Sequence, residues 1–244
     1  MSGSVIQHMN IYEIGSIAEK LSSNTYPGRG IILGITPDGT KAAAAYFIMG
    51  RSVNSRNRVF TEEPDGIRTE AFDPSKMADP SLIIYHPVRE RAEGLIVTNG
   101  DQTDTIADGF AKGLSFEEAL RTREFEPDGP NFTPRISGVQ MKDGSYKLSI
   151  LKSVDAEGSA CVRQFFEYPP VAGLGHFIHT YVCDGNPIPT FQGEPERVDI
   201  TDDIDEYTGI LWNNLNPDNR VSLFVRFTDL KSGEYEQLIV NENT

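Results

Sequence analysis

Three arginines lie in one short segment that contains no acidic residue. Arg51, Arg56 and Arg58 are separated only by Ser, Val and Asn. A guanidinium group forms planar, charge-assisted hydrogen bonds with phosphate or carboxylate, and the Ser and Asn side chains add neutral donors. The segment therefore indicates an anion-binding loop, although ordinary surface ion pairs with the nearby Glu62 and Glu63 would explain it equally well.

A second candidate lies at residues 99–105, between an apolar run and a predicted helix. It contains Asn99, Asp104 and Thr105. A turn from a strand into a helix exposes backbone N–H groups and the positive end of the helix dipole, which suits an anion or a polarised carbonyl. The simpler interpretation is a helix cap, in which Asp101 or Thr103 satisfies the first helical amides. The segment lacks the Gly-Lys-Ser/Thr ending of a phosphate-binding P-loop.

The third candidate is a loop stiffened by three prolines and a glycine within residues 125–134. It brings Glu126 and other carboxylates close to Arg135. A rigid loop positions catalytic groups well, and a carboxyl can transfer protons as a general acid or base. The competing interpretation is an exposed turn with solvated acids.

Weaker signals come from a tyrosine, two histidines and two cysteines. Tyr85 ends the apolar run 82–84, where it is either core or presents its hydroxyl at a strand end. His176 and His179 would point to opposite faces of a strand, so we expect no metal site there. We expect Cys161 and Cys183 to be reduced thiols in the core, with one bridge between them left open.

The elements that position these residues follow from the hydrophobic pattern. Helical spacing predicts helices over 11–21, 103–112, from 115 onward, and over 199–215. The expected strands are 31–35, 41–49, 81–88, 95–98, 135–142, 146–151, 160–168, 177–183, 221–230 and 235–240. This order predicts a single α+β domain over residues 9–244, with two sheets and helices packed outside them. We interpret residues 1–8 as a tag or a disordered leader.

Composition limits the partners. The chain has 244 residues, with 22 Lys and Arg against 36 Asp and Glu, for a net charge of −14. Such a charge opposes binding to nucleic acid and to anionic membranes, so we expect neither as a partner. No apolar run is long enough for a membrane helix, and no targeting segment is visible, which predicts a cytoplasmic protein. The clustered arginines still predict one cationic pocket for a small phosphorylated molecule.

These motifs together resemble the archaeal-type IMP cyclohydrolase family, and bacterial IMP cyclohydrolase-like members most closely. Tyr85 contributes to the resemblance, and the chain departs from the smaller archaeal enzymes at Gln102, where they tend to carry His. The other segments that carry it are 26–30, 51–56, 99–108, 121–128 and 133–136.

The resemblance implies a fold and a reaction. The fold would be similar to the N-terminal-nucleophile hydrolases, with four layers in the order αββα. The reaction would close the purine ring of 5-formamidoimidazole-4-carboxamide ribotide to give IMP and water, in de novo purine biosynthesis. That chemistry requires neither a metal nor an organic cofactor. The family also tends toward symmetric assemblies, so the resemblance implies a homo-oligomer.

Roles for individual residues also follow from the resemblance. It places Arg56, Tyr85 and Glu126 in the catalytic site, with Tyr85 and Glu126 handling protons and polarisation and Arg56 binding the carboxamide or the phosphate. Which group is the acid and which the base stays open. The residues expected to bind and position the nucleotide are Arg51, Arg58, Asn99, Asp104, Thr105 and Arg135.

Two other function classes fit the same residues. One is a nucleotide-binding or regulatory protein on this scaffold, which would bind a ribotide without turning it over. The other is an amidohydrolase of the N-terminal-nucleophile type acting on a different substrate, which would require processing to expose its nucleophile.

Overall fold

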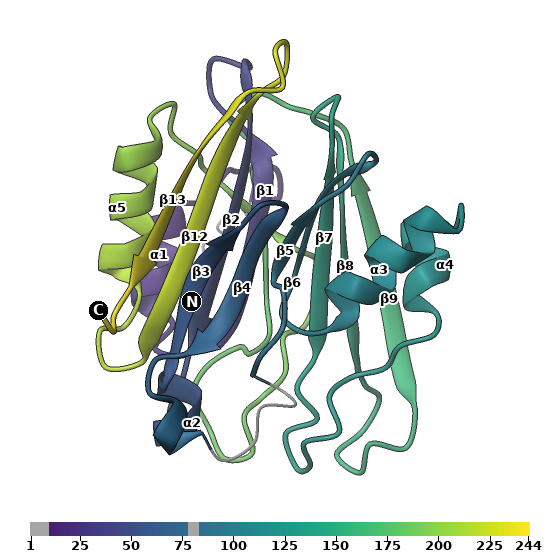
Figure 1. Cartoon of the computed structure of the whole chain (residues 1–244), viewed down its shortest axis with the longest axis vertical. Helices are drawn as coiled ribbons and strands as arrows, with labels where there is room; N and C mark the ends of the chain where they lie inside the picture. Colours follow the sequence, from purple (N-terminus) through teal and green to yellow (C-terminus); the bar gives the residue numbers. More distant parts are fainter. Residues whose placement is uncertain (1–9, 78–82) are drawn as a thin grey trace, which may run out of the picture.

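The computed structural model describes residues 10–77 and 83–244. Two antiparallel sheets lie face to face, and helices cover the outer face of each (Figure 1). The first sheet has the order β11 (Glu196–Val198), β10 (Gly175–His179), β1 (Arg29–Ile35), β2 (Lys41–Met49), β12 (Arg220–Asp229), β13 (Tyr235–Asn241). The second has the order β3 (Arg58–Glu63), β4 (Gly66–Ala71), β5 (Val88–Glu90), β6 (Gly94–Thr98), β7 (Arg135–Met141), β8 (Tyr146–Ser153), β9 (Cys161–Tyr168).

Three apolar cores hold these layers together. Helices α1 (Ile17–Ser23) and α5 (Ile204–Asn214) pack on the outer face of the first sheet. Helices α3 (Gln102–Ala111) and α4 (Phe116–Leu120) pack on the outer face of the second. A third core fills the space between the sheets. The predicted α+β class is confirmed, and the four layers run α, β, β, α.

Burial on both faces explains why the central strands are apolar throughout. Strand β2 has eight consecutive buried residues, 42–49, because one face meets the helical layer and the other meets the second sheet. A strand covered on both sides reads as a continuous apolar run instead of an alternating one. The predicted limits of this strand, 41–49, are confirmed at both ends.

Several predicted boundaries were wrong where long-range pairing overrides the local pattern. The helix expected from Ile11 begins only at Ile17, because Gly15 pairs with strand β11 through hydrogen bonds to Arg197 and Asp199. The helix expected over 199–215 begins at Ile204, after an N-cap at residue 203. The strand expected over 177–183 ends at residue 179.

The predicted strand 81–88 was also wrong in the part that can be described. Residues 81 and 82 lie outside the described residues, and residues 83–87 form no strand. The Thr69 hydroxyl donates to the carbonyl oxygens of Ile83 and Tyr85, at 2.7 and 3.1 Å, and so holds this segment beside β4. Elements that were not predicted are β3, β4, β11, α2 (Val53–Arg56) and the 3-10 turn η1 (Pro74–Lys76).

Two further expectations concern cysteines and membrane helices. Cys161 and Cys183 are both free, which confirms the prediction of unpaired thiols. The expected core position was wrong, because Cys161 is half-buried and Cys183 is exposed. Across residues 10–77 and 83–244, none of the helices has the length and apolar character needed to cross a bilayer.

Candidate active site

Three of the strands that begin with an arginine bring it close to one acid at the same end of the sandwich. Arg29 opens β1, Arg58 opens β3 and Arg135 opens β7. The loop between α4 and β7 carries Glu126 to this end, and the charges of all three arginines act on its carboxyl group. The strand ends therefore gather three cations around one acid, even though the protein as a whole is acidic.

Glu126 is the acid at the centre of this cluster. Its side chain is almost entirely buried, and its backbone N–H donates to the Thr133 carbonyl oxygen at 2.9 Å. Burial raises the pKa of Glu126 to about 7, although the guanidinium groups of Arg29 and Arg135 act in the opposite direction. A carboxyl that titrates near neutral pH can donate or accept a proton under working conditions, as a general acid or base must.

Arg58 has a donor without a partner in the part of the chain that the structure describes. The side chain is fully buried; its Nε donates to the Ser55 carbonyl oxygen at 2.8 Å and its Nη2 lies 3.5 Å from the Met49 oxygen. Its Nη1 has no partner among the described residues. Burial, and then the charge of Arg29, lower the pKa of Arg58. A buried donor without a partner costs free energy of folding. Its presence in the structure therefore indicates that Arg58 Nη1 can bind a ligand.

Arg29 has a similar environment. Its buried Nε also has no partner among the described residues. Burial acts to lower the pKa of Arg29, but neighbouring acidic groups, first Tyr26 and then Glu126, raise it on balance. The guanidinium therefore stays charged. The buried Arg58 and the half-buried Arg29 together offer two cations with free N–H groups beside a protonatable carboxyl.

Two tyrosine hydroxyl groups complete the inner part of the site. The hydroxyl of Tyr85 lies 2.8 Å from that of Tyr46, and both side chains are buried. Burial raises the pKa of both phenols, so both are neutral near pH 7. The Tyr85 backbone is fixed by Thr69, whose Oγ1 accepts from the Tyr85 N–H at 2.9 Å. Arg58 and Arg29 are the charges that act most strongly on Tyr85, which places its hydroxyl in the same cluster.

A hydrogen-bonded group holds the Glu126 loop against the first sheet. The Thr133 hydroxyl lies 2.6 Å from the Tyr181 hydroxyl, and the Asp128 carboxylate accepts from both the backbone N–H and the hydroxyl of Thr133. The ring of Tyr181 stacks on Tyr26, with centroids 5.9 Å apart. The loop is therefore fixed on the C-terminal side of Glu126.

The structure brings some of the predicted site residues together and not others. Tyr85, Glu126, Arg58 and Arg135 belong to one cluster, and the Arg135 Nη1 also donates to Gln102 Oε1 at 2.8 Å. Arg51 lies further out, over the ring of Tyr26 at 5.1 Å, and pairs with the Asp184 carboxylate. Arg56 is directed elsewhere: its Nε donates to Gly50 O at 2.9 Å and its Nη2 to Asn219 Oδ1 at 3.2 Å.

The predicted residues of the 99–105 turn have separate positions. Asn99 is buried, and its side chain ties the turn to β7 through Pro134 O at 2.8 Å and the Ile136 N–H at 2.9 Å. Asp104 is exposed and accepts from Arg89 Nε at 2.6 Å, and Thr105 is half-buried next to it on α3.

The suggested cap of α3 also differs from the structure. Asp101 occupies the cap position, but its side chain bonds none of the helical amides. Its carboxylate instead accepts from Arg123 and, at 2.8 Å, from Arg135. These two arginines are thereby held beside the Glu126 loop.

Sequence reasoning gave no catalytic or binding role to Arg29, Tyr46 or Tyr181. Arg29 is a single cation before an apolar strand, and Tyr46 lies in an Ala-rich apolar run that resembles ordinary core. Their neighbours in space are far away along the chain, so local spacing holds no signal for them. The resemblance of segment 26–30 to the family was the one pointer to Arg29.

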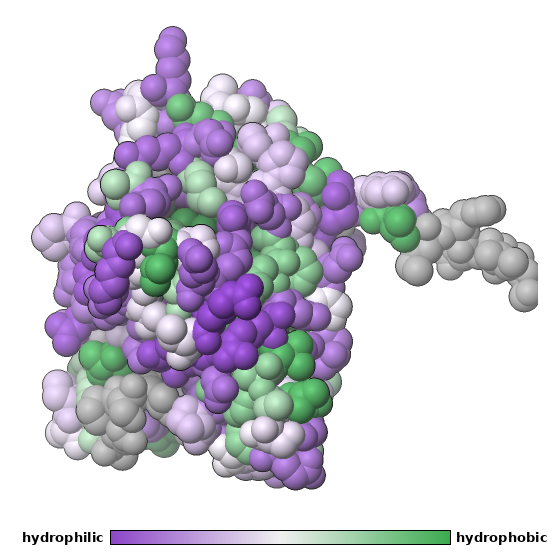
Figure 2. All heavy atoms as spheres, turned by 90° about the vertical axis from the view of Figure 1, so that its right-hand side faces the viewer, coloured by the Kyte–Doolittle hydropathy of each residue, from purple (hydrophilic) through white to green (hydrophobic). Residues whose placement is uncertain are grey.

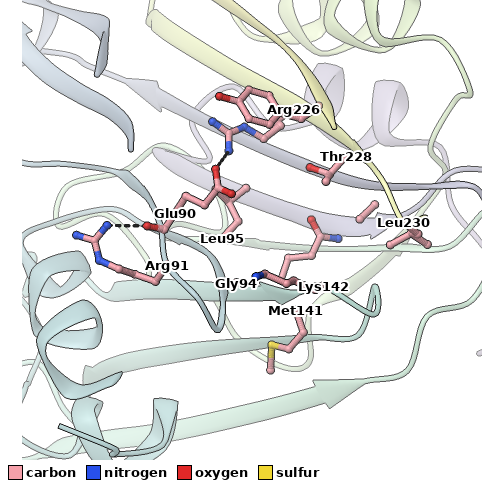
Figure 3. Close-up of a pocket in the computed structure, with 12 residues that line it drawn as sticks. Glu90, Arg91, Gly94, Leu95, Met141, Lys142, Arg226, Thr228 and Leu230 are labelled. Carbon is pink, nitrogen blue, oxygen red and sulfur yellow. Dashed lines mark hydrogen bonds and ion pairs between the residues drawn. The ribbon is translucent and has the colours of Figure 1, made fainter. Parts of the chain in front are cut away.

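The opposite end of the sandwich has a small hollow between the sheets (Figure 3). Its volume is about 60 Å³, which is room for roughly two waters. There Arg226 donates through Nη1 to Glu90 Oε2 at 3.0 Å and through Nε and Nη2 to Gln237 Oε1, while its guanidinium stacks on the Tyr235 ring at 3.8 Å. Each nitrogen of this arginine has a partner, so the hollow lacks the free donors of the Glu126 end.

Comparison with known proteins identifies the family. A sequence model of the family described as IMP cyclohydrolase-like protein matches residues 26–233. The IMP cyclohydrolase of Methanococcus aeolicus is 28% identical over 162 residues, which cover 65% of this chain and 75% of that protein.

Two further archaeal proteins are similar over shorter stretches. The IMP cyclohydrolase of Methanopyrus kandleri is 36% identical over 116 residues, covering 46% of this chain and 57% of the relative. That of Methanococcus maripaludis strain S2 is 34% identical over 126 residues, covering 50% and 61%. The match of the family model, which extends over most of the chain, confirms the resemblance expected from the motifs: the chain belongs to the family of IMP cyclohydrolase-like proteins.

Proposed function

We propose that this protein is an IMP cyclohydrolase that converts 5-formamidoimidazole-4-carboxamide ribotide into IMP and water. Membership of the family and the names of the archaeal relatives support this reaction. The observation that carries the proposal is Glu126, a buried carboxyl that titrates near pH 7 beside two arginines with unused donors.

The reaction places three demands on the site. The carboxamide nitrogen is a poor nucleophile and must attack the formyl carbon, forming a C–N bond and a carbinolamine that then loses its hydroxyl group as water. The site must polarise the formyl oxygen, accept a proton from the attacking nitrogen and donate one to the departing oxygen. Because both reacting groups belong to one molecule, holding them in attack geometry supplies a large part of the acceleration.

The described residues can meet these demands. Glu126 would move the proton between nitrogen and departing oxygen, since its protonated and ionised forms are both populated near pH 7. The neutral Tyr85 hydroxyl, held by Tyr46, would donate to the formyl oxygen. The free N–H groups of Arg29 and Arg58 would stabilise negative charge, on the developing oxyanion or on the phosphate.

The remaining predicted residues are proposed to act at the rim or through the loops. We assign Arg51 and Arg135 to positioning the ribotide, and Asn99, Asp104 and Thr105 to holding the turn beside it. Arg56 bonds the backbone of Gly50 and the side chain of Asn219, so we assign it to fixing the turn that delivers Arg58. The four-layer arrangement supports a fold similar to the N-terminal-nucleophile hydrolases, but the proposed chemistry uses no N-terminal nucleophile.

The test is to follow formation of IMP by the purified full-length chain. We expect closure faster than the spontaneous reaction, and a loss of at least about 100-fold in Glu126→Gln, which is the usual contribution of a proton-transferring group. Glu124→Gln is the matched control, because Glu124 lies in the same loop but is exposed. Its activity should stay within about twofold of the wild type.

Two results would overturn the proposal. Closure at the spontaneous rate, with IMP bound tightly, would identify a nucleotide-binding protein on this scaffold. Equal activity of Glu126→Gln and the wild type would remove Glu126 from the chemistry.

A further inference from the structure

We propose that strand β9 forms an interface with β9 of a second copy of this chain. The two strands would pair antiparallel about a two-fold axis at Phe165, so that the seven-stranded sheets of both copies form one continuous sheet. This inference does not depend on the proposed catalytic function, because it rests on the sheet edge alone.

The other sheet edges are covered in the structure. Gly15 covers β11, with its N–H donating to Arg197 O at 3.1 Å and its carbonyl accepting from the Asp199 N–H at 3.0 Å. Strands β3 and β13 cover one another, because the Asn241 side chain bonds both the N–H and the carbonyl of Phe60, at 2.8 and 3.1 Å. Within the described ranges, the backbone of β9 pairs with β8 alone (Figure 1).

Strand β9 lacks the features that usually protect a free edge. Such edges are commonly short, bulged, or blocked by Pro or Lys. β9 runs for eight residues without Pro or Lys, and its register with β8 is unbroken from Tyr168 to Cys161. Seven of the eight are only half-buried, among them Phe165 and Phe166. Figure 2 faces this side of the molecule and shows apolar areas beside strongly hydrophilic ones.

Symmetry limits the register to a few choices. A two-fold axis that pairs a strand with itself in antiparallel fashion stands perpendicular to the sheet and keeps the same face outward in both copies. The axis must therefore pass beside a single residue of each strand. An axis at Gln164 would place Arg163 opposite the aromatic ring of residue 165 of the second copy. An axis at Phe166 would place Arg163 opposite a residue that lies beyond the end of the strand.

Only the register centred on Phe165 pairs the two charged residues of the strand. It places Arg163 opposite Glu167 of the second copy, twice by symmetry, with the two Phe165 rings adjacent. Opposite charges facing each other across strands stabilise a sheet, as do adjacent aromatic rings. The Glu167 side chain is 75% exposed, and among the described residues its ion-pair partner is Lys147 at 3.4 Å. Arg163 donates through Nη2 to the Arg123 carbonyl oxygen at 2.7 Å, and its nearest carboxylate in the same copy, that of Glu124, lies at 3.7 Å.

Sedimentation velocity of the full-length chain over a range of concentrations tests the interface. We expect a concentration-dependent dimer, and at least tenfold weaker association for Glu167→Arg, which would place like charges opposite one another. Adding Arg163→Glu to that variant should restore association, because the pair is then exchanged. The matched control is Glu236→Arg, a charge reversal of a half-exposed residue on β13, which should leave association unchanged.

Hydrogen exchange on the same samples gives a second readout that does not depend on a variant folding correctly. Amides of residues 161–168 should gain protection as concentration rises, while those of residues 235–241 should not. Three results would each overturn the proposal. The chain could be monomeric at every concentration, the dimer could form equally well with Glu167→Arg, or the dimer could form without added protection of the β9 amides.

Discussion

An arginine is buried at each end of the sandwich, and the two arginines differ in whether all their nitrogens have hydrogen-bond partners. At one end Arg226 shares its donors between Glu90 and Gln237 and stacks on an aromatic ring. At the other end Arg58 is buried just as completely, but one of its nitrogens has no partner within the described part of the chain. A satisfied buried charge contributes to the fold. An unsatisfied one beside a protonatable carboxyl costs stability, and we propose that it binds substrate.

The largest expected effect is a difference in kcat/KM between variants of the two arginines. Arg58→Met should lower kcat/KM by about 100-fold or more, the usual loss when a preorganised donor to developing negative charge is removed. Arg226→Met should stay within about twofold of the wild type, because its hollow is too small and too well satisfied to hold substrate. Steady-state kinetics of ring closure measure both. Similar losses in the two variants would remove the distinction between the ends.

The pH dependence of stability should follow Glu126. Its folded pKa of about 7 lies above the ordinary glutamate value of 4.5, so the folded state binds the proton more tightly. Folding is therefore penalised as pH rises from about 4.5 to about 7. At about 1.4 kcal/mol per pKa unit, the penalty is at most about 3 kcal/mol above pH 7.

Glu126→Gln should remove this penalty. The variant should be more stable than the wild type at pH 8, and the difference should disappear near pH 4. Urea unfolding at the two pH values measures it, with Glu124→Gln as the exposed control. The same titration predicts a bend near pH 7 in the pH profile of kcat/KM, which should be absent from the residual activity of Glu126→Gln. A stability difference between Glu126→Gln and the wild type that does not change with pH would contradict the raised pKa.

The two arginine substitutions should also differ in their effect on the free energy of unfolding. Here the larger loss is expected for Arg226→Met, the variant with the smaller loss of activity. Arg226→Met leaves the acceptors on Glu90 and Gln237 without their donor and should cost about 1–3 kcal/mol of unfolding free energy. Arg58→Met removes a buried charge with an unpaired nitrogen and should be neutral or stabilising. Chemical unfolding of both variants at pH 8 measures this. Destabilisation of Arg58→Met as large as that of Arg226→Met would show that Arg58 serves the fold.

The sequence predicts a feature of the fold well when the residues that determine the feature lie close together along the chain. The two-sheet α+β architecture follows from the hydrophobic pattern, and β2 was predicted to the residue because apolar side chains fill both of its faces. Strands β3 and β4 were missed because they are largely polar and short. Tyr85 was placed at a strand end, whereas a side chain on β4, that of Thr69, holds it in an irregular segment.

The candidate site shows the same difference between residues marked by a local signal and residues brought together by long-range pairing. The prolines of the loop, which are a local signal, pointed to segment 125–134, and the family resemblance then assigned Glu126 within it. Arg29 was not assigned a role, because only the pairing of β1 with its neighbours brings it near residue 126. The clustering of arginines along the chain predicted a cationic pocket. The charges that act on Glu126 together with that of Arg58 are those of Arg29 and Arg135, whereas Arg51 pairs with Asp184 and Arg56 bonds Gly50 and Asn219.

The smallest effect expected compares two buried tyrosines, one at each end. Tyr46 hydrogen-bonds Tyr85 at 2.8 Å, and Tyr146 hydrogen-bonds His176 Nδ1 at 2.6 Å. Replacing either by Phe removes one hydroxyl from a buried pair, and each should cost about 1 kcal/mol of stability. Activity should differ: Tyr46→Phe frees the Tyr85 hydroxyl to rotate and should lower kcat a few-fold with little change in KM.

Tyr146→Phe is the control for that comparison, because its partner His176 lies outside the proposed site. Its kcat should match the wild type at the same loss of unfolding free energy. If both variants lowered kcat in proportion to their loss of stability, Tyr46 would be a core residue like Tyr146. A kcat effect confined to Tyr46→Phe shows that orientation of the Tyr85 hydroxyl, and not general packing, is what the inner tyrosine contributes.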